Sequence, residues 1–156
     1  MPDRIYIDKQ TPSVYQAMVK ASTEIRTQGK AAGLTRKTLE LVNIRVSQIN
    51  RCLFCLDLHS HAALEAGETT QRIAVLPAWR ETDLFDEAER AALEIAEAVT
   101  LVADGHLSDE QYASVRKHLT DDQVSVLIYS AITINAFNRI SIMSRHPVRR
   151  RSPIPG

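Results

Sequence analysis

Apolar residues recur every three or four positions along almost the whole chain. In the segment 35–50, for example, Leu39, Val42 and Val46 fall on one side of an α-helix. No run shows the strict alternation of apolar and polar residues, bounded by turns, that is typical of a half-buried β-strand. The pattern therefore predicts an all-α protein.

Glycine and proline residues divide this pattern into segments. Gly29 and Gly33 mark the end of the first helix, and Gly67 is placed to cap the third. Pro77 and Pro147 stop two later helices. The sequence thus predicts about seven helices, over residues 12–29, 35–50, 51–66, 69–76, 86–103, 108–119 and 120–144.

The last three helices carry a second start signal, a side chain that accepts hydrogen bonds from the free N–H groups of the first turn. In each case Glu or Gln follows three residues later and completes a capping box. The pairs are Asp86 with Glu89, Ser108 with Gln111, and Thr120 with Gln123.

One domain accounts for the whole pattern. The chain has 156 residues, of which 44% are hydrophobic and 24% charged, and this balance is typical of a globular protein with a sizeable core. We expect a short extended arm over residues 1–11, a helical domain over 12–146 and a basic, proline-rich tail over 147–156. The domain is predicted to be a helical bundle.

Charge and hydropathy bear on partners and location. Lys+Arg and Asp+Glu both number 19, so the zero net charge does not favour nucleic acid or an anionic membrane, and does not oppose self-association. Polar residues interrupt the apolar run 124–143, which reads as a buried helix rather than a membrane span. Residues 1–11 are too polar for a secretory signal. A cytoplasmic location without nucleic-acid or membrane partners is the expectation.

The segment "NRCLFCLDLHSH", residues 50–61, holds both cysteines of the chain, Cys52 and Cys55. Residues three apart on a helix lie on one face about 5 Å apart, which suits a disulfide or a shared metal. In the cytoplasm such a pair is more often catalytic or metal-binding than structural. If the pair opens a helix, the positive end of the helix dipole lowers the pKa of a thiol, which favours redox chemistry.

Two further residues complete the candidate site. His59 lies one helical turn after Cys55, where an imidazole can accept the thiol proton directly or through water. Glu40 lies at the edge of the apolar stripe of the preceding helix and needs a partner, which a helical hairpin would supply. The order of the thiols stays open, because the helix dipole favours Cys52 while the spacing to His59 favours Cys55.

The combined spacing of Glu40, eleven residues, Cys52-x-x-Cys55 and x-x-x-His59 resembles the signature of the alkylhydroperoxidase AhpD-like branch of the carboxymuconolactone decarboxylase family. Similar segments extend over about residues 12–145 and include "GLTRKTLELVNIRVSQINRC", "HSHAALEAGET", "PAWRETDLFDEAERAAL" and "INAFNRI". The resemblance implies an AhpD-like helical fold, with the C-x-x-C motif at the start of a central helix, that assembles into trimers or hexamers.

The resemblance also implies an antioxidant enzyme, a peroxidase that reduces organic hydroperoxides with a redox-active disulfide. Cys55 would attack the peroxide, Cys52 would resolve the intermediate, and His59 with Glu40 would relay protons. No bound cofactor is expected, because electrons would arrive from an external dithiol such as a lipoyl group. Phe54 departs from relatives that carry His between the cysteines. The lactone decarboxylation of relatives without these cysteines is not carried over.

Two alternatives use the same residues. Cys52, Cys55 and His59, with His61 as an optional fourth ligand, have donor atoms that suit zinc. On a continuous helix, however, His59 and His61 point apart. The other alternative is a redox sensor in which a Cys52–Cys55 disulfide changes an oligomer interface.

Overall fold

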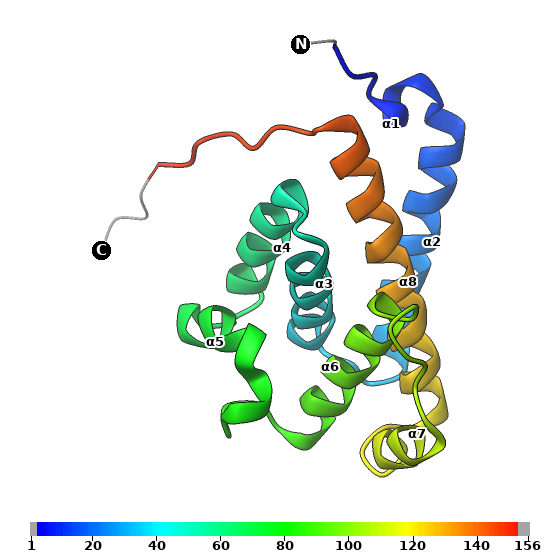
Figure 1. Cartoon of the computed structure of the whole chain (residues 1–156), viewed down its shortest axis with the longest axis vertical. Helices are drawn as coiled ribbons and strands as arrows, with labels where there is room; N and C mark the ends of the chain where they lie inside the picture. Colours follow the sequence, from blue (N-terminus) through cyan, green and yellow to red (C-terminus); the bar gives the residue numbers. More distant parts are fainter. Residues whose placement is uncertain (1–2, 153–156) are drawn as a thin grey trace.

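The computed structural model describes residues 3–152 as a bundle of α-helices (Figure 1). No strand occurs within this range, which confirms the predicted all-α, single-domain fold. The helices are α1 (Ile7–Gln10), α2 (Pro12–Ala31), α3 (Arg36–Asn50), α4 (Leu53–Glu65), α5 (Thr70–Val75), α6 (Glu87–Thr100), α7 (Asp109–Val115) and α8 (Asp121–Ser144), with a 3₁₀ helix, η1 (Leu76–Glu81), after α5.

The structure adds two short elements to the seven predicted helices. α1 occupies part of the arm that was predicted to be extended, and η1 covers much of the predicted loop between Pro77 and Phe85. The predicted arm and tail also include residues 1–2 and 153–156, which lie outside the described range.

The prediction for Gly29 was wrong, because α2 continues through it and the chain turns at Gly33, whose φ is +81°. Gly29 has a packing role instead. A Cβ atom at this position would lie 3.1 Å from Leu39 Cδ1, so the missing side chain lets α2 approach α3 closely. At Gly67 the φ of +92° confirms the predicted cap that follows α4.

Side-chain caps define the starts of α3, α5, α6, α7 and α8. All three predicted capping boxes, which open α6, α7 and α8, are present. Thr35 and Thr69 accept hydrogen bonds at the starts of α3 and α5 in the same way. Cys52 is the N-cap residue of α4, so the C-x-x-C motif lies at the start of a helix, as predicted.

α3 lies at the centre of the bundle and packs against α4, α6 and α8. Leu39, Val42 and Val46 join one core cluster with residues of α6 and α8. Leu41 and Ile44 join a second cluster, which Trp79 and Phe85 close from η1 and the loop after it. Because α3 is buried on both sides, Glu40 between these two sets has only 7% of its surface exposed.

α8 is the only helix among residues 3–152 that is long and apolar enough to span a membrane by length and composition. It packs against α2, α3, α4 and α6, and it buries Leu127, Ala131 and Ile134 in the first core cluster. Its polar residues join helices: Asn138 is fully buried, donates to Ser47 Oγ at 3.0 Å and accepts from Asn50. These contacts are those of a core helix.

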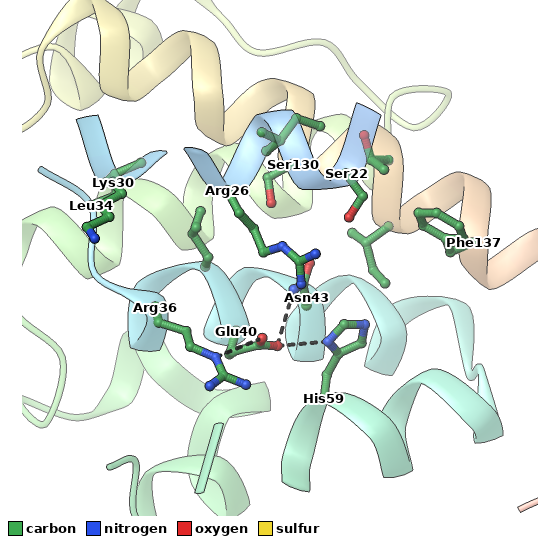
Figure 2. Close-up of a pocket in the computed structure, with 14 residues that line it drawn as sticks. Ser22, Arg26, Lys30, Leu34, Arg36, Glu40, Asn43, His59, Ser130 and Phe137 are labelled. Carbon is green, nitrogen blue, oxygen red and sulfur yellow. Dashed lines mark hydrogen bonds and ion pairs between the residues drawn. The ribbon is translucent and has the colours of Figure 1, made fainter. Parts of the chain in front are cut away.

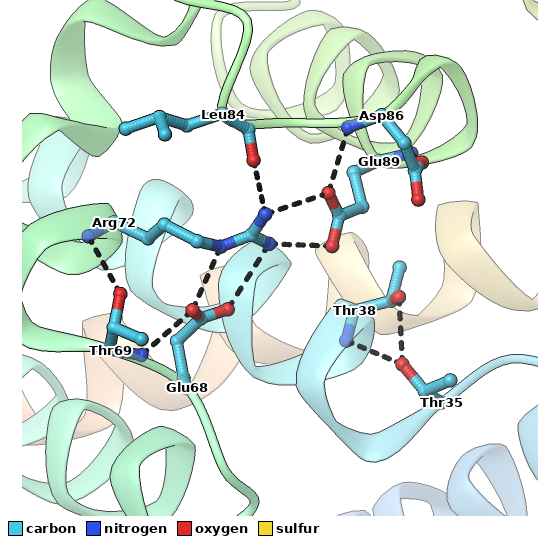
Figure 3. A network of polar contacts seen from close by, with 8 residues as sticks. All are labelled: Thr35, Thr38, Glu68, Thr69, Arg72, Leu84, Asp86 and Glu89. Carbon is cyan, nitrogen blue, oxygen red and sulfur yellow. Dashed lines mark hydrogen bonds and ion pairs between the residues drawn. The ribbon is translucent and has the colours of Figure 1, made fainter.

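A partly buried arginine connects the outer elements to the bundle (Figure 3). Arg72 on α5 pairs with Glu68 at 2.8 Å and with Glu89 on α6 at 2.6 Å, and it donates to the carbonyl of Leu84. Its guanidinium also lies over the ring of Phe85. The Glu68 side chain is almost fully buried, so its charge depends on Arg72 for compensation.

Replacing Arg72 with Met will lower the free energy of unfolding by about 3–5 kcal/mol, because the change leaves the Glu68 charge buried and unpaired. Urea unfolding followed by circular dichroism measures this loss. The matched control is Arg151→Met, which breaks an exposed pair with Asp57 and is expected to change stability by less than about 0.5 kcal/mol. Equal effects of the two substitutions would contradict the structural role assigned to Arg72.

Candidate active site

The turn between α3 and α4 brings two of the predicted site residues together (Figure 2). Arg51 adopts a left-handed conformation with φ of +54°, and the chain then reverses direction through Cys52. His59 on α4 thereby lies against α3, with its Nδ1 2.7 Å from Glu40 Oε2. This contact is the shortest polar link between the two helices of the hairpin.

Glu40 is held in its ionised form. Burial opposes ionisation, but the hydrogen bond and the charge of His59 outweigh it and hold the pKa of Glu40 below its ordinary value. Asn43 at 3.2 Å and Arg36 at 3.9 Å act in the same direction. Since a carboxylate can only accept hydrogen bonds, His59 donates from Nδ1, and its Nε2 is left as the basic nitrogen.

Cys52 and Cys55 are both free thiols and both buried, with exposed fractions of 0% and 3%. The interaction with the Cys55 thiol is the main cause that lowers the pKa of Cys52, to about 6. Burial opposes this shift, whereas the N–H groups of Cys55 and Phe54 add to it. The same contact, followed by burial, raises the pKa of Cys55. Cys52 is therefore the more acidic thiol, as the dipole argument favours.

Cys52 is the more acidic thiol, but only Cys55 has access to a cavity. Cys55 and His59 both line a cavity of about 490 Å³ that α1, α2, α4 and α8 enclose, whereas Cys52 lines neither this cavity nor the next one. His59 also lines the second cavity, of about 410 Å³, together with Glu40. Arg26 on α2 reaches into the second cavity towards Asn43 (Figure 2).

Four further residues belong to the surroundings of the thiols and were not predicted as site residues. The Asn138 side chain interacts with both sulfur atoms, and Ser141 interacts with Cys55. His146 and Asp8 line the same cavity as Cys55. The sequence carried no signal for Asp8 and His146, because 138 positions separate them. Asn138 and Ser141 could have been found as polar residues three positions apart on an apolar helix.

The zinc alternative finds no geometric support in the described part of the chain. His59 contacts Glu40, whereas His61 points to the outer side of α4 and lies 3.3 Å from the exposed Glu65. Between residues 3 and 152 no three His, Cys, Asp or Glu side chains are grouped so that they could hold a metal ion.

The sequence matches the carboxymuconolactone decarboxylase family over residues 12–98. The uncharacterised protein YdfG of Bacillus subtilis is 42% identical over 124 residues, which are 80% of this chain and 84% of YdfG. The uncharacterised protein YnjA of Escherichia coli is 36% identical over 61 residues, 39% of this chain and 34% of YnjA.

Two solved structures have a similar fold. A protein of unknown function from Agrobacterium tumefaciens, described as a candidate antioxidant defence protein AhpD, superimposes with a TM-score of 0.84 at 30% identity, over 95% of this chain and 100% of that one. The debrominase Bmp8 has a TM-score of 0.76 at 17% identity, over 90% of this chain and 74% of its own, and shows the fold alone. The chain belongs to the carboxymuconolactone decarboxylase family, in its AhpD-like branch.

Replacing Glu40 with Gln tests the buried contact between Glu40 and His59 through its pH dependence. The folded state holds the pKa of Glu40 below 4.5, so the pair stabilises the fold above about that pH and the stabilisation is lost as the pH falls further. We expect the variant to be about 1–3 kcal/mol less stable at pH 7, and the difference to shrink below pH of about 4.5.

Thermal unfolding of both proteins across pH measures this difference. Glu65→Gln, which alters the exposed pair with His61, is the matched control and is expected to show less than about 0.5 kcal/mol at any pH. A stability gap for Glu40→Gln that persists unchanged at acid pH would contradict the interpretation.

Proposed function

We propose that the protein is a dithiol peroxidase that reduces organic hydroperoxides. The observation that supports this most strongly is the shared cavity: the Cys55 thiol and the His59 imidazole face one space, with Cys52 in contact with Cys55 behind it. Glu40 fixes the tautomer of His59. The likeness to the Agrobacterium protein described as a candidate AhpD agrees with this proposal.

In the first step, Cys55 loses its proton to His59 Nε2, directly or through a water molecule in the cavity. The thiolate attacks the terminal oxygen of the hydroperoxide, the S–O bond forms, and the O–O bond breaks. The leaving alkoxide takes the proton back from the His59 imidazolium and departs as an alcohol. Cys55 is then a sulfenic acid.

In the second step, Cys52 attacks the sulfenic sulfur of Cys55. A disulfide forms, and the hydroxyl group leaves as water after it takes up a proton. The N–H groups of Cys55 and Phe54 also lower the pKa of Cys52, and they stay in place when Cys55 is oxidised, so they favour the Cys52 thiolate that this step requires. An external dithiol of the lipoyl type reopens the disulfide by thiol–disulfide exchange and is itself oxidised, so no bound cofactor is needed.

The assignment of the attacking thiol rests on access rather than acidity. The two thiols shift each other's pKa, so a proton shared between them can lie on Cys52 when the peroxide reacts with Cys55. Of the two, only Cys55 lines the cavity where an organic hydroperoxide can enter. Phe54, Leu58, Phe137 and Ile140 line the same space and suit an apolar substituent.

A titration of thiols tests the proposed reaction. One equivalent of cumene hydroperoxide is expected to remove two thiols per chain, and dihydrolipoamide is expected to restore both, because the product is the Cys52–Cys55 disulfide. The Cys55→Ser variant should keep its remaining thiol, whereas Cys52→Ser should form a sulfenic acid that dimedone traps.

Two results would contradict the proposal. One is survival of both thiols in the wild type at excess peroxide. The other is a loss of activity on addition of a chelator, which would favour the zinc alternative. A sulfenic acid found at residue 52 in the Cys55→Ser variant, at the wild-type rate, would reverse the thiol order.

Assembly into a homo-oligomer is part of the proposal. Several apolar side chains are exposed on α4 and α8, among them Leu53, Tyr129, Ile132 and Met143. Exposed apolar side chains on two helices that pack together support contacts between subunits, and the zero net charge does not oppose such contacts.

Light scattering of the purified protein is expected to give the mass of a trimer or a hexamer. The mass should be the same for the reduced and the oxidised protein, because the thiols are buried within one chain. A mass that changes with oxidation state would favour the redox-sensor alternative, and a monomer would contradict the assembly.

A further inference from the structure

A second histidine lies beside the thiols. His146 follows the C-terminal end of α8, where the N-terminal arm and α1 lie next to it (Figure 1). Its Nε2 is 2.9 Å from Asp8 Oδ1, and its Nδ1 is 3.2 Å from Ser141 Oγ. The ring also meets the edge of Phe54, the residue before Cys55, at a centroid distance of 5.4 Å.

The three polar residues are shielded from solvent. The Asp8 and His146 side chains are 18% and 14% exposed, and Ser141 is 7% exposed. All three line the cavity that contains Cys55. Ser141 and Cys55 line this cavity together, and the Ser141 hydroxyl acts to lower the pKa of the Cys55 thiol.

We infer that Asp8, His146 and Ser141 form a second proton relay that serves the Cys55 thiol. The Glu40–His59 pair reaches Cys55 from α4 itself, whereas the second relay reaches it from α8 and the N-terminal arm. The inference rests on the proposed function, because the proton transfer would serve the reaction of Cys55 with a hydroperoxide.

The hydrogen-bond chemistry fixes the direction of the relay. The Asp8 carboxylate can only accept, so His146 donates from Nε2–H and its Nδ1 becomes an acceptor. Ser141 donates its hydroxyl proton to Nδ1, and the lone pairs of its oxygen remain available to the Cys55 S–H group. The order is that of a nucleophile, a base and an orienting carboxylate.

The proton balance of the transfer is simple. The proton of the Cys55 thiol moves to Ser141 Oγ while the hydroxyl proton of Ser141 moves to His146 Nδ1. Cys55 becomes a thiolate that accepts a hydrogen bond from Ser141, and His146 becomes an imidazolium paired with Asp8. No electrons are transferred in this step, and the reverse movement can protonate a leaving oxygen.

Other titratable or charged groups also face this cavity and shape its pH response. They are Tyr6 and Lys9 from the arm and α1, Tyr15 and Arg26 from α2, His59 from α4, and Arg149 from the tail. A pH profile of the wild type alone would therefore combine several groups. Variants that change one relay residue at a time isolate the contribution of each.

The same contacts also tie the arm to α8, so a purely structural role must be distinguished. Two other hydrogen bonds also connect the arm and α1 to α8 and do not involve the thiol. Ile7 N–H donates to Ser144 Oγ at 3.1 Å, and Arg4 donates to the Met143 carbonyl at 3.1 Å. Ser144→Ala weakens the tie and leaves the relay intact. It is the matched control for Ser141→Ala, one helical turn away on the same helix.

The experiment measures the rate of alkylation of Cys55 by iodoacetamide from pH 5.5 to 10, in full-length protein that carries Cys52→Ser. This small neutral reagent reports the thiolate without peroxide. Ser141→Ala and His146→Gln are expected to raise the midpoint of the profile by about one pH unit and to lower the rate at pH 7 about tenfold. Asp8→Asn keeps an acceptor for His146 but loses the charge, so it should shift the midpoint less, in the same direction.

Ser144→Ala is expected to lower the thermal midpoint and to leave the pH profile unchanged. An unchanged profile in Ser141→Ala, or the same shift in Ser144→Ala, would overturn the relay. If Ser141→Ala does not fold, Asp8→Asn decides by the same criterion. Because alkylation needs no peroxide, shifted profiles in an enzyme without peroxidase activity would refute the proposed function and keep the relay.

Discussion

The buried contact between Glu40 and His59 is the interaction on which the rest of the site depends. α3 is apolar on two faces because it separates two core clusters, and this leaves Glu40 largely shielded from solvent. An unpaired carboxylate in that position would be costly, so the hairpin partner must supply a hydrogen-bond donor. His59 supplies it at 2.7 Å, and the requirement of the core thereby fixes the orientation of the proposed catalytic base.

α8 supplies the other half of the environment of the thiols. A helix with its length and apolar composition could serve packing alone, yet Asn138 and Ser141 bring polar atoms to the sulfurs within the core. Asn138 is also bound to Ser47 and Asn50 of α3, so its amide cannot turn away from the site. The rigidity of the central helices thus becomes preorganisation of the reactive pair.

Sequence reasoning found the parts of this protein whose cause is local. Helix starts at Asp86, Ser108 and Thr120 follow from capping chemistry within four residues, and the structure has all three. The grouping of Cys52, Cys55 and His59 follows from helical spacing, and the apolar surroundings of Glu40 were sufficient to indicate a hairpin partner. Each of these inferences used contacts between residues close in sequence or on consecutive helices.

The features that the sequence did not predict have non-local causes. Gly29 reads as a helix breaker, but close approach to Leu39 on the next helix determines its role. Asp8 and His146 meet only because the arm folds back onto the end of α8. Single residues in polar segments near the two ends carry no periodicity that could predict such a pair.

Two bases around one thiol are chemically useful because the reaction requires two proton movements at different places. Deprotonation takes a proton from sulfur, whereas cleavage of the O–O bond needs a proton at the departing oxygen, beyond the sulfur–oxygen bond. His59 is held by α3, while His146 is held by the arm. The first is as rigid as the core, and the second exists only when α1 is docked. The proposed chemistry of Cys55 is therefore tied to the folding of a segment that contributes nothing buried to the main core.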